Sequence, residues 1–341
     1  MGKKISIIIP CYNVGDFLGR CWKSLLNQTI GIDALECIFV NDGSSDEGRT
    51  IDKLHNIEGD SPENVVIIDM DRNMGQGEAR NIGIQYATGK YLMFLDADDE
   101  LRADACERVY GLAEENGADI IQFNHLYILG DETRSSNASA ETRFYQIKTR
   151  EDRIPFLIDS KVTFGCTNKL YRLQLVKEIG VQFPAGVKYE EPLFVYPLFL
   201  YADRIMLLKE DLYLYHFNEG STVTSMLGKR ILDHPNVQLR LLDFVMNLDR
   251  YEEYRQIIEI YFLWTFYLET ISFASSERDC VIPLEYFGYM QEMCKKLCPD
   301  WGENPYLHLI PDDARKVLMS TDRTFRTQNE LNEFVINSGN F

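Results

Sequence analysis

The first part of the chain alternates short apolar runs with segments that are apolar on one face only. The strand-like runs cover residues 5–9, 37–40, 65–68, 91–95 and 119–123. They predict buried strands, because a strand covered on both faces is apolar throughout. The helix-like segments between them cover residues 17–26, 79–87 and 106–113. Strands that alternate with helices over about 125 residues predict an α/β fold with a doubly wound, mainly parallel sheet flanked by helices.

After about residue 225 the pattern changes to helical periodicity without strand signals. The apolar positions Val237, Leu241 and Val245 recur at helical spacing, and residues 251–268 form a strongly aromatic helix. We therefore expect an α/β domain over residues 1–225 and a mostly helical domain or extension over residues 226–341. The aromatic stripe is expected to be core or a subunit contact. Glu259 and Glu269 interrupt its most apolar part, which argues against a membrane span.

Acidic residues follow two of the predicted strands. Asp96, Asp98 and Asp99 come directly after the run at 91–95, and Asp42 comes after the run at 37–40. Open α/β sheets bind ligands at the carboxyl ends of their strands. Carboxylates this close repel one another unless a cation lies between them, and hard oxygen ligands suit Mg²⁺ or Mn²⁺. The alternative is that Asp98 and Asp99 cap the next helix.

The charge and the cysteine pattern argue against some classes of protein. The chain has 341 residues with 35 Lys and Arg against 53 Asp and Glu, a net charge of -18. This excess of acid disfavours nucleic-acid binding, which depends on neutralising phosphates. The eight cysteines include no CxxC pair, and the N-terminus lacks the apolar stretch of a signal peptide. We expect reduced thiols and a cytoplasmic protein, with peripheral association at the inner face of the membrane.

Four segments identify a family when they are taken together. They read SIIIPCYN at 6–13, FVNDGSSD at 39–46, NMGQGEARNIG at 73–83 and FLDADD at 94–99. In this order and spacing they resemble a family 2 glycosyltransferase of the GT-A fold, of the non-processive bacterial type. A dinucleotide-binding domain is disfavoured because no GxGxxG follows the first strand. Fainter similarity continues through residues 167–172, 183–184, 189–194, 213–216 and 220–224.

The resemblance implies roles for the acids that follow the fourth strand. Asp98 matches the metal-binding carboxylate of the family's DxD motif, with Mn²⁺ or Mg²⁺ as the cofactor. Asp96 is implied to contact the donor ribose or to share the metal. For Asp99, a role in the site and a role as a helix cap both stay open. His216, near the end of the resemblance, is a candidate metal or diphosphate ligand, and the alternative is a structural histidine.

Other residues are implied to bind the donor. Asp42 matches the acid that contacts uracil in relatives that use uridine donors, or it is only a turn-former. Pro10 offers backbone groups to the base and Tyr12 can stack on it, or Tyr12 is simply core. Arg80 matches a donor-binding arginine, or it forms a surface salt bridge.

The general base is expected from the acceptor side. Glu190 and Glu191 stand where relatives usually have Glu-Asp, and the second acid is the usual base. The longer Glu191 at that position leaves the assignment between the two open. The alternative is a solvated acidic pair at the start of a helix.

The sequence thus predicts a metal-dependent, inverting glycosyltransferase. It would move a sugar from a nucleotide-diphosphate donor, by default a UDP-sugar, to a hydroxyl of a glycan or lipid-linked acceptor in surface polysaccharide synthesis. One alternative is a sugar-1-phosphate nucleotidyltransferase, but residues 10–16 lack the glycine-rich, basic phosphate loop that it needs. The other is a catalytically inactive scaffold that binds a partner through its helical tail. A homo-oligomer formed through the C-terminal helices is a further expectation.

Overall fold

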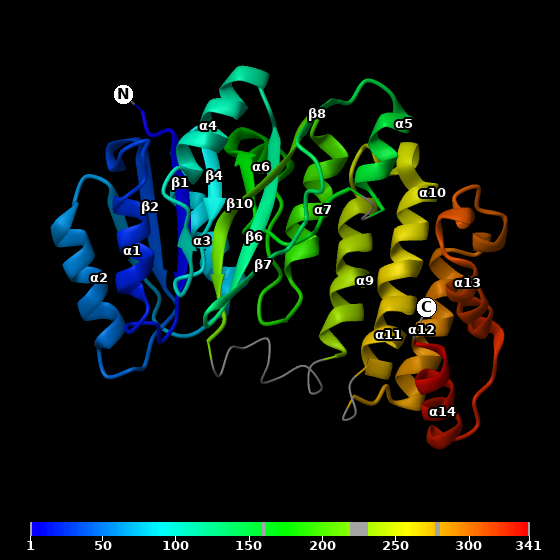
Figure 1. Cartoon of the computed structure of the whole chain (residues 1–341). Helices are drawn as coiled ribbons and strands as arrows, with labels where there is room; N and C mark the ends of the chain where they lie inside the picture. Colours follow the sequence, from blue (N-terminus) through cyan, green and yellow to red (C-terminus); the bar gives the residue numbers. More distant parts are fainter. Residues whose placement is uncertain (1, 159–160, 219–230, 277–279, 340–341) are drawn as a thin grey trace. The chain divides into compact units, whose positions relative to one another are not determined.

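A computed structural model describes the chain except for residues 1, 159–160, 219–230, 277–279 and 340–341 (Figure 1). The chain forms two compact units. Unit 1 comprises residues 1–153, 161–186 and 193–218, and unit 2 comprises 154–160, 187–192 and 219–341. The predicted boundary after residue 225 lies outside the described residues. Residues 187–192, which carry Glu190 and Glu191, group with the helical unit 2.

Unit 1 is built on one mixed sheet. Its strands are β1 (Ile5–Cys11), β2 (Leu35–Asn41), β3 (Val65–Asp69), β4 (Tyr91–Phe94), β5 (Glu100–Leu101), β6 (Ile120–Leu129), β7 (Glu132–Ser135), β8 (Arg143–Gln146), β9 (Lys169–Arg172) and β10 (Arg204–His216). The order is β3-β2-β1-β4-β9-β6-β10-β5, with β7 paired to β6 and β8 to β10. Strands β3, β2, β1 and β4 are parallel neighbours, as are β6 and β10. Strand β9 lies antiparallel between β4 and β6.

Helices cover both faces of this sheet. They are α1 (Leu18–Leu26), α2 (Arg49–Asp60), α3 (Gln76–Tyr86), α4 (Ala105–Asn116), α5 (Arg150–Arg153), α6 (Leu173–Ile179) and α7 (Glu191–Tyr201), with a 3-10 turn η1 at Ile32–Ala34. On one face, Ile7 and Ile9 of β1 belong to a core with Trp22 of α1 and Val109 of α4. On the other face, α3 lies so close to β1 that a Cβ on Gly83 would meet the Ile8 side chain at 2.5 Å. The predicted α/β fold with a doubly wound, mainly parallel sheet is confirmed.

Unit 2 is helical in its described part. Its elements are η2 (Ile154–Phe156), α9 (Asp233–Met246), α10 (Tyr251–Phe262), a π-helical turn η4 (Leu263–Leu268), α11 (Glu269–Ser276), α12 (Leu284–Leu297), η5 (Trp301–Glu303), η6 (Leu307–Leu309), α13 (Asp312–Leu318), η7 (Met319–Asp322) and α14 (Gln328–Ser338). The stripe residues Tyr254, Tyr261 and Leu268 are buried, which confirms their prediction as core.

The helical segment Tyr251–Ser276 is the one described stretch whose length and composition would allow it to cross a membrane. Its most apolar window has a mean hydropathy of 1.3, and 72% of that window is buried within the structure. A core helix of a folded domain shows this combination of apolar composition and burial. All eight cysteines are likewise buried.

Candidate functional site

The loops that follow β1 and β2 are joined at the carboxyl edge of the sheet. The register pairs Cys11 with Asn41, and the next amide, Asp42 N–H, donates to Cys11 O at 2.8 Å. Asn13 accepts the Ser45 N–H at 2.8 Å through its side-chain oxygen. Pro10 is the penultimate residue of β1, and Tyr12 beyond it is 44% exposed. The alternative of Tyr12 as a core residue is therefore wrong, and its ring is available to a ligand.

Asp42 fixes the loop that leads into α3. Its Oδ1 accepts the Met74 N–H at 2.6 Å and its Oδ2 accepts the Gly75 N–H at 2.8 Å. Burial raises the pKa of this carboxyl, and the two N–H bonds oppose that shift. The next residue, Gly43, has φ +62, and a Cβ there would lie 2.4 Å from the Arg72 carbonyl carbon. A carboxylate has further lone pairs, so the predicted base contact of Asp42 stays a prediction.

Arg80 of α3 forms a buried ion pair with Asp96. Its Nη2 lies 3.0 Å from Asp96 Oδ1, and its side chain is 2% exposed while that of Asp96 is 31% exposed. The guanidinium also lies over the Phe183 ring, 5.4 Å from its centre. Because the pair is buried at the arginine end, the surface salt-bridge alternative is wrong. Arg80 aims one Asp96 oxygen and leaves part of the carboxylate accessible.

The neighbouring Asn81 holds the Phe183 segment beside α3. Its Nδ2 donates to Phe183 O at 2.9 Å, and its Oδ1 accepts the Phe183 N–H at 2.8 Å. Phe183 then stacks on Phe194 of α7 with ring centres 4.3 Å apart. The ring on which Arg80 rests is thus fixed from both sides.

The half-buried Asp98 is held at its side chain and at its backbone. Asn218 Nδ2 donates to Asp98 Oδ2 at 2.8 Å, and Arg20 Nε donates to the Asp98 carbonyl at 2.9 Å. Along the turn, Asp96 and Asp98 are partly exposed whereas Ala97 and Asp99 are buried. Both acids of the DxD pattern are therefore accessible to solvent.

Asp99 is a buried brace between the turn and β10. Its carboxylate accepts the Tyr213 hydroxyl at 2.7 Å and the His216 N–H at 2.8 Å. The same hydroxyl accepts the Asp96 N–H at 3.1 Å. Burial, reinforced by repulsion from Asp96, raises the pKa of Asp99 to about 8. The helix-cap alternative for Asp99 is wrong, because β5 follows it and α4 begins only at Ala105.

The His216 side chain is engaged at the end of β10. Its Nε2 lies 2.8 Å from Glu100 Oε1. Among the residues that the structure describes, no three His, Cys, Asp or Glu side chains are grouped closely enough to hold a metal ion. Metal binding by His216 and Asp98 stays a prediction.

The two candidate base residues differ in exposure. Glu190 is 2% exposed, whereas Glu191, the first residue of α7, is half-buried. The reading of both as a solvated acidic pair is therefore wrong for Glu190. The preceding residue, Tyr189, has φ +62, a left-handed conformation that bulky side chains rarely adopt. Which acid is the base stays a prediction, and accessibility favours Glu191.

Sequence reasoning missed the residues that hold the acids in place. Arg20, Asn218 and Tyr213 position the turn at 96–99 without belonging to any of its motifs. Only Tyr213 had a signal, as part of a segment with faint family similarity. Arg20 reads as an ordinary polar position on α1, since nothing in a helical pattern says which strand-end loop it reaches.

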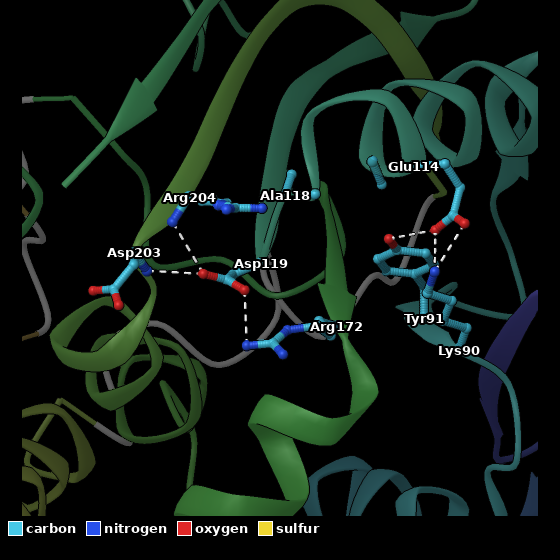
Figure 2. Close-up of a pocket in the computed structure, with 10 residues that line it drawn as sticks. Lys90, Tyr91, Glu114, Ala118, Asp119, Arg172, Asp203 and Arg204 are labelled. Carbon is cyan, nitrogen blue, oxygen red and sulfur yellow. Dashed lines mark hydrogen bonds and ion pairs between the residues drawn. The ribbon is translucent and has the colours of Figure 1, made fainter.

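A pocket of about 400 Å³ lies at the opposite ends of the strands, where β4, β6 and β10 begin (Figure 2). Four of its charged side chains pair with one another. Asp119 accepts from Arg172 at 2.8 Å and from the backbone N–H groups of Asp203 and Arg204, and Lys90 pairs with Glu114 at 2.6 Å. These contacts cross-link the strand starts, and the candidate donor-site acids are not among its residues.

Comparisons with known proteins agree on one family. A family model described as "Glycosyl transferase family 2" matches residues 6–180. The chain is 30% identical to the uncharacterized glycosyltransferase YibD of Escherichia coli over 264 residues, which are 76% of this chain and 74% of YibD. It is 34% identical to a poly(ribitol-phosphate) beta-glucosyltransferase of Bacillus spizizenii over 215 residues, 62% of this chain. That match spans about a third (32%) of the Bacillus protein.

A solved structure shows the same fold. The crystal structure of Staphylococcus aureus TarS 1–349 in complex with UDP-GlcNAc has a TM-score of 0.71 and 20% sequence identity. It is matched over 98% of this chain and 91% of that one. The likeness therefore covers the helical part as well as the sheet.

Proposed function

The chain belongs to glycosyltransferase family 2, and from that premise we propose that it transfers a single sugar from a UDP-sugar to a hydroxyl of a glycan or lipid-linked acceptor. The observation that carries the proposal is the braced turn that presents Asp96 and Asp98. Arg80 binds one oxygen of Asp96 and Asn218 binds one oxygen of Asp98. The two aspartates stay partly exposed. Two relatives are named as poly(ribitol-phosphate) glycosyltransferases, and these names support an acceptor in surface polysaccharide synthesis.

The carboxylates fit a divalent cation. Two partly exposed oxygen donors on one turn are the ligand type that Mn²⁺ and Mg²⁺ prefer. The raised pKa of Asp99 reflects burial and the negative charge gathered at this turn, which a cation would relieve. We propose that Asp98 binds the ion and that Asp96 shares it or contacts the ribose. When bound, the ion would neutralise charge on the departing diphosphate.

The remaining roles belong to side chains of the chain itself. Tyr12, exposed beside the fixed loop of Asp42, is proposed to stack on the uracil, with Pro10 and Asp42 at the base edge. Glu191, at the accessible start of α7, is proposed to remove the proton of the acceptor hydroxyl as the hydroxyl attacks the anomeric carbon. Attack opposite the leaving diphosphate inverts the configuration at that carbon.

Two other functions, a nucleotidyltransferase and an inactive scaffold, are less well supported. The family assignment favours transfer of sugar over transfer of nucleotide, and the intact Asp96–Asp98 turn argues against an inactive scaffold. A cytoplasmic location at the inner face of the membrane and self-association through the C-terminal helices are further parts of the proposal. Neither alters the chemistry at the turn.

A panel of nucleotide sugars tests the proposal. The purified chain should release UDP from at least one UDP-sugar, faster with Mn²⁺ or Mg²⁺ than with chelator. Asp98→Asn should lose that stimulation, and the anomeric configuration of the isolated product should be inverted relative to the donor. Release of pyrophosphate from a nucleoside triphosphate and a sugar phosphate would instead indicate a nucleotidyltransferase.

A further inference from the structure

The segment that carries the candidate base is packed within the helical unit. The Lys188 N–H donates to Asp233 Oδ2 at 3.1 Å, at the start of α9. The Tyr189 ring meets His234 edge-on at 5.5 Å and lies nearly parallel to Phe273 of α11 at 6.3 Å. His234 and Phe273 are themselves in edge contact at 5.0 Å. The three rings thus form one cluster that joins residues 187–192 to two helices of unit 2.

The backbone at Tyr189 needs such support. Its φ of +62 is a left-handed conformation that costs a bulky residue free energy and persists only where the surroundings hold it. Tyr189 is followed by Glu190, and α7 begins at the next residue, Glu191. The conformation at Tyr189 therefore sets the direction of the backbone at Glu190 and Glu191.

The ring partner His234 is itself fixed. Its Nε2 lies 2.8 Å from the Thr265 carbonyl, inside the π-helical turn η4. Thr265 Oγ1 lies 3.0 Å from Tyr261 O and 3.1 Å from Gln238 Oε1, which share its one proton, so the turn is also tied to α9. A bond to a carbonyl requires a proton on Nε2. Single π turns inside long helices frequently occur at functional sites.

We propose that Tyr189 is a positioning residue for the general base: the helical unit holds its ring between His234 and Phe273 and so fixes the backbone that carries Glu190 and Glu191. The inference rests on the proposed function, because it assigns Tyr189 a role only if one of these acids is the base. It makes the helical unit a working part of the transferase. Phe273 is 39% exposed, so its contact with Tyr189 adds little to the core of unit 2.

The test compares kcat, the donor KM and UDP affinity among variants of the full chain. Tyr189→Ala should lower kcat about 100-fold, because a misplacement of about 1 Å in a catalytic group has that effect, and should leave UDP affinity within about twofold. Tyr189→Phe keeps the ring and should keep kcat within about threefold. Phe273→Ala should lower kcat about tenfold. The matched control is Tyr289→Ala, which removes a 41% exposed aromatic of the same unit that packs on Tyr286, and kcat should not change.

Two further variants separate positioning from folding. Tyr189→Gly adopts a positive φ without strain but lacks the ring, so it should fold and should be as slow as Tyr189→Ala. The second variant is a double mutant. Tyr189→Ala is added to whichever of Glu190→Gln and Glu191→Gln has the lower kcat. The added change should lower kcat by a further factor of less than about two, because both changes act through one group.

The outcomes distinguish this inference from the function beneath it. If the wild-type chain releases UDP from no donor, the proposed function is wrong. If the wild-type chain is active but Tyr189→Gly matches it, or Tyr189→Ala loses no more kcat than Tyr289→Ala, the positioning role is wrong and the function stands. If Tyr189→Ala lowers kcat as much in the glutamine variant as in the wild type, the positioning role is also wrong.

Discussion

Arg80 Nη2 lies 3.0 Å from Asp96 Oδ1, with the arginine 2% exposed and the aspartate 31% exposed. The pair couples α3 to the turn after β4, so two motifs that lie apart in the sequence act as one element. A buried guanidinium that holds one carboxylate oxygen aims the other oxygen outward. The geometry of the site thus depends on residues that need not touch the substrate.

Replacement of Arg80 by lysine should weaken donor binding. Lysine is a point charge on a flexible stem and cannot reproduce the planar fork or its stacking on Phe183. We expect about a tenfold loss in UDP affinity, or about 1.4 kcal/mol, measured by calorimetric titration. The control is Arg49→Lys, whose ion pair with Asp16 is 61% and 72% exposed, and its UDP affinity should be unchanged. Equal affinities for both variants would contradict the aiming role of Arg80.

Tyr213→Phe removes the hydroxyl shared by Asp99 and the Asp96 amide. Loss of one of the two donors to the buried Asp99 carboxyl should lower the free energy of unfolding by about 1–3 kcal/mol, measured by urea denaturation. Because the turn would be held less firmly, UDP should also bind more weakly in the presence of Mn²⁺. Tyr127→Phe, at a tyrosine whose ring packs on Tyr215, is the control and should change neither quantity. An unaltered unfolding curve for Tyr213→Phe would argue against the brace.

Gly43→Ala tests the close approach of two loops at the donor edge. A Cβ there would lie 2.4 Å from the Arg72 backbone, in addition to the cost of φ +62. Gly31→Ala is a matched control, because Gly31 has φ +83 and nothing within 4 Å of its Cβ position. Gly31→Ala should lower the free energy of unfolding by about 1 kcal/mol, and Gly43→Ala should lower it by clearly more and weaken UDP binding. Equal effects would mean that the loops do not need this contact.

Acid should destabilise the helical unit through His234. Burial lowers the pKa of this side chain from 6.5 to about 4, so the unfolded chain binds more protons between these pH values. The stabilising contribution is present above pH 6.5 and is lost as the pH falls toward 4. The loss in the free energy of unfolding should reach about 2 kcal/mol between pH 8 and pH 5. Glu269, 3.6 Å away, reduces this loss by attracting the charged ring.

The measurement compares urea denaturation of the wild type and His234→Gln at both pH values. Groups common to both proteins cancel in the comparison, so the variant should lose less stability than the wild type on acidification. A variant that loses as much as the wild type would show that His234 is not the group responsible.

The first of the five apolar runs predicted β1 because both faces of that strand are covered, as Ile7 and Ile8 illustrate. Strand β9 gave no such signal. It is four residues long and contains Lys169, whose buried Nζ donates to Gly165 O at 2.6 Å and to Asn168 Oδ1 at 2.8 Å. A pattern of apolar positions cannot show that a lysine will be buried among oxygen acceptors.

The motifs likewise indicated which acids matter but not what holds them. Asn218 reaches Asp98 across 120 positions of sequence, and no local pattern encodes that contact. The grouping of residues 187–192 with the helices depends on Tyr189, His234 and Phe273, which come together only in the fold. The left-handed backbone at Tyr189 has no signature in the sequence, since tyrosine is a residue that rarely adopts it.

In the proposed enzyme the Asp96–Asp98 turn binds a nucleoside diphosphate together with a divalent ion. Calorimetric titration of UDP into the full chain, with Mn²⁺ and then with chelator, tests it most directly, and Asp98→Asn is titrated in parallel. We expect binding with Mn²⁺ that weakens at least about tenfold with chelator and in the variant. UDP affinity that is the same in all three titrations would contradict the account.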